Sequence, residues 1–131
     1  MRFGMSDAGT ACRGLRGAIT VNGEGADAVR DATVELLEGL VAMNGCRLED
    51  IAAAIFTVPD DLAGSNPPAA ARQHGWDRVP LLAVREHGGD APVPRCLRVL
   101  VLWNTPRAQA DVRHAYLRGA ALLRPDLQVG P

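Results

Sequence analysis

RCLRVLVLW, residues 95–103, decides the fold class of this chain of 131 residues. Its alternation places Leu97, Val99 and Val101 on one side, and Arg98 with apolar neighbours on the other. Strands that are apolar on both sides are typical of layered α/β domains. A guanidinium keeps its proton in such a place, so Arg98 is expected to meet a buried anionic group or an anionic ligand.

The composition restricts the class of protein. Hydrophobic residues make up 47% of the chain, charged residues 22%, and the formal net charge is −1, which is typical of a single globular domain. No basic block indicates a nucleic-acid binder or a membrane-surface protein. No apolar run approaches the roughly 20 residues of a membrane-spanning helix. Cys12, Cys46 and Cys96 have no paired spacing, and the N-terminus lacks the apolar centre of a signal peptide, which favours a reduced, cytoplasmic protein.

The remaining elements follow from periodicity and from breaking residues. A helix is expected from Asp27, as its N-cap, to Asn44, with Gly45 ending it in a left-handed conformation. Strands are expected at 13–21, 51–58, 79–86 and 95–103, with a short helix at 67–75 and a final helix at 105–123.

This order, β-α-β-α-β-β-α, predicts an α+β domain in which one sheet carries its helices on one face. The strands at 79–86 and 95–103 are expected to form a hairpin with a longer loop. The sheet's other, mostly apolar face would then be buried by self-association, so we expect a homo-oligomer with binding clefts at subunit boundaries.

Four polar residues stand where packing alone would not place them, namely Arg16, Glu86, Arg98 and Tyr116, and Arg72 on the short helix is a fifth candidate. Arginines that converge on a cleft bind a small polyanion, because guanidinium pairs with carboxylate through two hydrogen bonds. A carboxylate at the rim could accept a hydrogen bond from a ligand hydroxyl, and a tyrosine could donate one. Since no Ser-His-Asp or Cys-His pattern and no phosphate loop is present, such a site would stabilise charge by positioning.

Each of these residues also has a structural interpretation. Arg16 and Glu86 could form an ion pair with no ligand between them. Arg98 could extend to an edge of the sheet. Tyr116 lies on an apolar stripe, where the default role is a core ring with a solvated hydroxyl, and Arg72 could be a solvated side chain.

Metal and thiol chemistry are weaker alternatives. The three histidines lack metal-ligand spacing, and a site made of Glu86, His87 and Asp90 is a minor possibility. Cys96 fits a small buried apolar residue better than a nucleophile.

Seven separated motifs occur in one order along the chain, namely RGLRGAITV, TVPDDL, PPAAAR, GWDRVPLLAVRE, RCLRVLV, RHAYL and LRPDL. Together they resemble the trimeric α/β class of chorismate mutase, from about Cys12 to Leu127. The resemblance implies a pseudo-α/β barrel with a mixed sheet, assembled as a homotrimer with active sites between adjacent subunits. It also implies a single domain over residues 12–127, between a flexible extension at 1–11 and a tail at 128–131.

The activity that the resemblance implies is the Claisen rearrangement of chorismate to prephenate, an isomerase reaction of aromatic amino acid biosynthesis in the shikimate pathway, without cofactor or metal. By motif, Arg98 matches the arginine that binds a carboxylate and the ether oxygen of the breaking bond. Glu86 matches the glutamate that accepts from the ring hydroxyl. Arg16 and Tyr116 match residues that contact substrate carboxylates, and Arg72 matches a more peripheral arginine.

The resemblance also implies which residues form the wall of the cleft. Leu123 matches a wall residue near the C-terminal tail. Ala83 stands where the family usually has a cysteine, Asn66 where it has a phenylalanine, and Ala69 where it has a lysine. The wall is therefore expected to be more open and less basic than is usual.

Two other functions remain open at this point. One is a non-catalytic or regulatory trimer that binds a small carboxylate metabolite, and the other is an imine deaminase of the related trimeric fold. The joint presence of Arg16, Glu86, Arg98 and Tyr116 favours the mutase, because a simple carboxylate receptor would not need Glu86.

Overall fold

The computed structural model describes residues 9–87 and 93–123. Its helices and strands are β1 (Ala11–Thr20), α1 (Gly25–Asn44), β2 (Ile51–Val58), α2 (Pro67–Ala71), β3 (Leu81–Arg85), β4 (Cys96–Thr105) and β5 (Ala115–Leu117). The expected extension falls mainly on residues 1–8, and the expected tail at 128–131 also lies outside the described residues. No helix among the described residues is long and apolar enough to span a bilayer.

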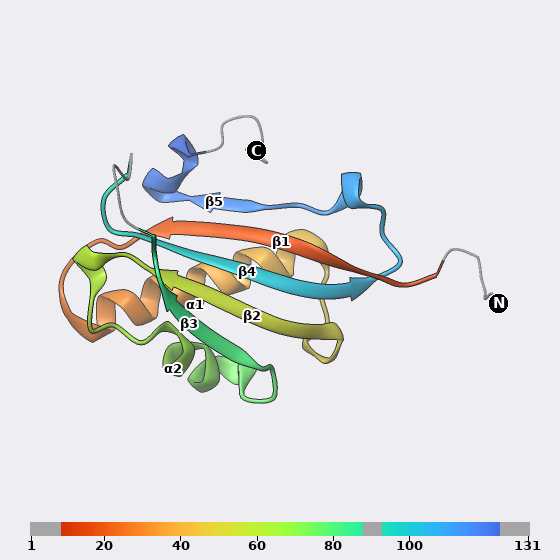
Figure 1. Cartoon of the computed structure of the whole chain (residues 1–131), viewed down its shortest axis with the longest axis horizontal. Coiled ribbons are helices and arrows are strands. Elements are labelled where there is room, and N and C mark those ends of the chain that lie inside the picture. Colours follow the sequence, from red (N-terminus) through yellow and green to blue (C-terminus); the bar gives the residue numbers. More distant parts are fainter. Residues whose placement is uncertain (1–8, 88–92, 124–131) are drawn as a thin grey trace.

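The strands form one mixed sheet in the order β3-β2-β4-β1-β5 (Figure 1). The three central strands are antiparallel, and β1 and β4 pair along their whole length, from Ala11 opposite Thr105 to Thr20 opposite Cys96. Both edge strands are parallel to their neighbours. The expected hairpin of β3 and β4 is therefore wrong: β2 lies between them, because α2 carries the chain from β2 into a parallel β3.

Helix α1 packs on one face of the sheet, which we call the helix face (Figure 1). The odd-numbered residues of β1 point toward it, and the core there is formed with Leu36, Leu37 and Leu40 of α1, each at most 1% exposed. Helix α1 lies very close to β1 at Gly17, where an added Cβ would be 2.9 Å from Leu40 Cδ1. Helix α2 packs against α1 on the same side. The predicted α+β fold with its helices on one face is confirmed.

The boundaries of α1 agree in part with the prediction. Gly45 ends the helix at φ 68°, and its N–H donates to Val41 O. Asp27 is not the N-cap, because the helix begins earlier, at Gly25 after Glu24. Asp27 lies in the first turn and pairs with Arg30 at 3.2 Å.

The final helix expected at 105–123 is wrong. After β4 the chain forms a 3-10 turn at Gln109–Asp111, the short strand β5, and another 3-10 turn at Arg118–Leu122. The buried Asn44 accepts from Arg113 N at 2.8 Å and donates to Arg113 O at 3.0 Å. Both backbone groups of Arg113 therefore bond to a side chain and not to the backbone of a helix. The sequence at 105–123 has the periodicity of a helix, but the hydrogen bonds between Asn44, at the end of α1, and Arg113 override that preference.

Neither α1 nor α2 covers the other side of the sheet, which we call the open face. Within the described residues, only one end of it, around Ala18 and Tyr116, is covered, by the 3-10 turn at Arg118–Leu122. Leu82, Val84 and Leu100 point to this side and are 56%, 41% and 39% exposed. Beyond Cys96, which is 4% exposed, the strand of Arg98 is therefore covered on one face only within the subunit, which corrects the expectation of a strand buried on both. An apolar face of this kind requires a partner surface.

Candidate functional site

The open face carries a row of side chains that crosses four strands and ends at Glu86, just after the fifth. The register places Thr57 of β2 opposite Arg98 of β4, Arg98 opposite Ala18 of β1, and Ala18 opposite Tyr116 of β5. Glu86 follows β3 at the other end of the row, and its N–H donates to Val58 O at 2.9 Å. Since the neighbours of Arg98 in the row are small, its long side chain has room to lie across them.

Arg98 and Glu86 form the charged centre of the row. Arg98 Nε lies 3.6 Å from Glu86 Oε1, which is longer than a hydrogen bond, and the two side chains are 39% and 25% exposed. Nε is itself shielded from solvent and has no hydrogen-bond partner in the described part of the chain. A shielded donor without an acceptor is costly, so it marks a place where a ligand oxygen would be favoured.

These positions decide between the earlier interpretations of the two residues. Arg98 does not reach an edge of the sheet, because β4 is its central strand. Glu86 pairs with Arg98, and no ion pair joins it to Arg16 within the described ranges. Glu86 Oε1 also accepts a hydrogen bond from the Thr57 hydroxyl. Sequence reasoning missed Thr57, because a single threonine in a strand such as IAAAIFTV, residues 51–58, is ordinary.

Arg16 supplies a second cation on the open face. It pairs with Leu100, two residues along β4 from Arg98, and such diagonal neighbours are roughly 7–8 Å apart. Its backbone N–H donates to His114 Nδ1 at 3.0 Å, which ties β1 to the segment leading into β5. Its exposed guanidinium has no ion pair or hydrogen bond in residues 9–87 and 93–123. The open face therefore carries two cations, Arg98 and Arg16, and one carboxylate, Glu86. This set suits a small ligand with two negative charges.

Tyr116 closes the row at β5. Its ring is 8% exposed and packs with Ala18, Cys96 and Ala120, and Leu123 lies partly buried against the same cluster. Burial raises the pKa of the Cys96 thiol, and the nearby Arg98 offsets this in part. The thiol therefore stays protonated near neutral pH, which agrees with the interpretation of Cys96 as a small buried residue.

Three of the candidate residues lie away from this row. Ala83 pairs with Phe56, whose side chain is in the core on the helix face, so Ala83 points to that side. Arg72 is exposed at the end of α2, and Asn66 begins α2, where its Oδ1 accepts from Ala69 N at 3.1 Å. One subunit therefore brings together Arg16, Glu86, Arg98, Tyr116 and Leu123, but not Arg72, Ala83 or Asn66.

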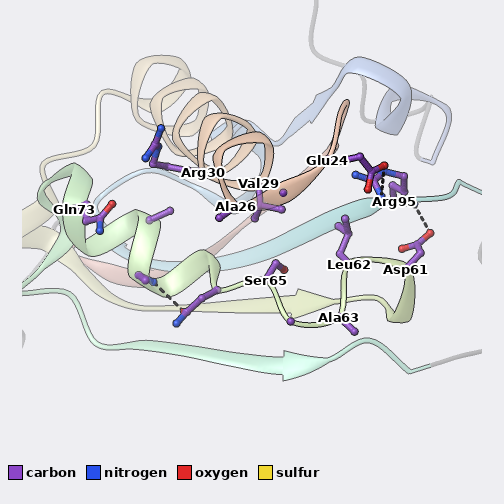
Figure 2. Close-up of a pocket in the computed structure, with 15 residues that line it drawn as sticks. Glu24, Ala26, Val29, Arg30, Asp61, Leu62, Ala63, Ser65, Gln73 and Arg95 are labelled. Carbon is purple, nitrogen blue, oxygen red and sulfur yellow. Dashed lines mark hydrogen bonds and ion pairs between the residues drawn. The ribbon is translucent and has the colours of Figure 1, made fainter.

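A cavity of about 470 Å³ lies apart from the row, between the start of α1 and α2 (Figure 2). Asn66 and Ala69, both expected in the wall of the cleft, line it, but Arg16, Glu86 and Arg98 do not. Charged side chains of both signs line it, such as Asp61 and Arg95. We therefore base the site on the row of the open face. No group of three or more His, Cys, Asp or Glu able to hold a metal ion occurs among the residues that the structure describes; Asp90 is outside them.

Comparison with known proteins agrees with this geometry. The family model of chorismate mutase type I matches residues 12–127. The chain is 51% identical over 117 residues to chorismate mutase AroH of Thermus thermophilus, covering 88% of this chain and 96% of that protein. It is 32% identical over 118 residues to chorismate mutase AroH of Bacillus subtilis, covering 89% and 93%. The solved chorismate mutase from Clostridium thermocellum superposes with a TM-score of 0.79 at 36% identity, covering 83% of this chain and 97% of that one.

These likenesses extend over nearly the whole chain and do not depend on any one motif. They agree in fold with the five-stranded sheet and in sequence with the segments that carry the charged row. The chain therefore belongs to the chorismate mutase type I family.

Proposed function

We propose that this chain catalyses the Claisen rearrangement of chorismate to prephenate on the open face of the sheet. The observation that carries the proposal is the shielded Nε of Arg98, which lacks a hydrogen-bond partner and has Glu86 beside it. Membership of the family supports the reaction, and the two cations on one face support a substrate with two carboxylates.

The reaction needs no nucleophile and no proton transfer, so the protein acts by holding a flexible dianion in a reactive geometry. Arg16 and Tyr116 bind carboxylates, and Glu86 accepts from the ring hydroxyl. As the carbon–oxygen bond breaks, negative charge grows on the ether oxygen. Arg98 meets that charge, and because its guanidinium is already in place, the interaction strengthens in the transition state.

The proposal includes a homotrimer with the site between subunits. The exposed leucines and valine of the open face support burial against another copy. Arg72, Ala83 and Asn66 belong to the cleft only if an adjacent subunit supplies them, since their own subunit holds them away from the row. The free cysteines support a reducing compartment, the cytoplasm.

The test replaces Arg98 with lysine and with alanine and follows the disappearance of chorismate by absorbance, with the product identified. Lysine keeps the charge but lacks the planar fork, so both variants should lose roughly 10²–10³-fold in kcat. Arg47→Lys is the matched control, because Arg47 forms an exposed ion pair with Asp50 and should retain full activity. Near-normal turnover by Arg98→Lys would refute the role of Arg98, and wild-type protein that forms no prephenate would refute the function.

A further inference from the structure

We propose that Thr57 is a positioning residue that keeps the carboxylate of Glu86 from closing onto Arg98. The inference rests on the proposed function, in which Arg98 needs a free donor for the substrate. It concerns one oxygen, Glu86 Oε1, which both accepts from the Thr57 hydroxyl and faces Arg98 Nε at 3.6 Å.

The hydroxyl of Thr57 has a well-defined position. Thr57 is paired on both sides, with Arg98 of β4 and with Val84 of β3, so its backbone is held by two strands. A β-branched side chain also has few rotamers. Glu86, in contrast, comes after the last residue of β3 and has a long side chain with several rotatable bonds. The more rigid hydroxyl therefore positions the carboxylate.

The hydrogen bond controls a competition for Arg98. An ion pair that shortened from 3.6 Å to a normal hydrogen bond would draw the whole guanidinium toward the protein carboxylate and away from the ether oxygen. It would also turn the Glu86 acceptor away from the substrate hydroxyl. By holding Oε1, Thr57 keeps Glu86 close enough to orient the guanidinium but leaves its exposed part free for the substrate.

The kinetic test compares Thr57→Val, which keeps the shape and removes the hydroxyl, with Thr57→Ser, which keeps the hydroxyl. Valine should lower kcat about ten- to a hundredfold and change KM much less, because the lost interaction belongs to the transition state. Serine should restore kcat to within about threefold of wild type. Thr33→Val is the matched control: its buried hydroxyl donates to Val29 O at 2.7 Å within α1, away from the row, so turnover should be normal.

Coupling to Glu86 separates positioning from packing. In a Glu86→Gln background, Thr57→Val should cost less than about threefold, because the neutral amide no longer competes for Arg98 with a full charge. The same tenfold or larger loss in both backgrounds would overturn the proposal, as would a Thr57→Val enzyme with normal kcat.

A crystal structure of Thr57→Val gives a readout that does not depend on activity. Glu86 should move so that its carboxylate hydrogen-bonds Arg98, and an unmoved carboxylate would overturn the inference. If the wild-type protein formed no prephenate, the proposed function would fall, whereas the position of Glu86 in this variant would still decide the role of Thr57.

Discussion

Gly17→Ala tests how closely α1 sits on the sheet. The added Cβ would lie 2.9 Å from Leu40 Cδ1 and 3.0 Å from both Leu36 Cδ1 and Val99 Cγ1, whereas ordinary contacts begin at 3.4 Å. Leu36 and Leu40 are at most 1% exposed, so they have no solvent to move into. Crowding of this kind lowers the free energy of unfolding by about 1–3 kcal/mol. Alanine also restricts the unfolded chain more than glycine does, which raises the free energy of unfolding by about 0.4–1 kcal/mol. We expect a net loss of roughly 1–2 kcal/mol, which for a domain of this size lowers Tm by about 3–8 °C.

The measurement is thermal and urea unfolding at one fixed protein concentration, because assembly makes Tm depend on concentration. Gly39→Ala is the control, in α1. Its Cβ would meet one atom, Leu117 Cδ1 at 3.5 Å, which is an ordinary contact. Since alanine also favours a helix more than glycine does, Gly39→Ala should be as stable as wild type or slightly more so. Equal stability of Gly17→Ala and wild type, or equal losses in the two variants, would contradict the packing argument.

Three further predictions concern stability, pH dependence and assembly. Asn44→Ala removes buried hydrogen bonds to Arg113 and should cost about 1–3 kcal/mol in urea unfolding, while unchanged stability would contradict a tie between α1 and β5. Burial raises the pKa of the Cys46 thiol from 9.0 to about 11. As the pH rises, this thiol ionises in the unfolded chain before it ionises in the folded one, so the free energy of unfolding should fall between about pH 9 and 11. Cys46→Ala should flatten that fall and exposed Cys12→Ala should not, and a Cys46→Ala profile that matched wild type would exclude this thiol as the cause. Leu100→Asp should dissociate the assembly in sedimentation velocity whereas Ala42→Asp, at an exposed position of α1, should not, and an intact Leu100→Asp assembly would place the interface elsewhere.

Local patterns in the sequence were enough for the long elements. The stripe of α1 and the left-handed Gly45 predicted the helix and its end, because both depend on neighbours within a few residues. The same reasoning failed for 105–123, where β5 is only three residues long and cannot show a period of its own. There, hydrogen bonds from Asn44 to Arg113 hold the chain out of the helical conformation.

The candidate site was also only partly predictable from local patterns. A charge in an apolar strand and an arginine on a face of small residues drew attention to Arg98 and Arg16 without any knowledge of the fold. Neither observation pointed to Thr57, because a single threonine in a strand is ordinary. Its meaning comes only from its neighbours in the sheet, where it lies between Glu86 and Arg98.

The sequence by itself determined which side chains share a face of their own strand, since alternation is a property of a few consecutive residues. It thereby identified Arg16 and Arg98 as unusual, and the motifs indicated the family. Only the tertiary structure decided that β2 separates β3 from β4, that Glu86 faces Arg98, and that the sheet is covered on one side. The physical reason is that strand order depends on backbone hydrogen bonds and burial between segments far apart in the chain, and no local pattern contains them.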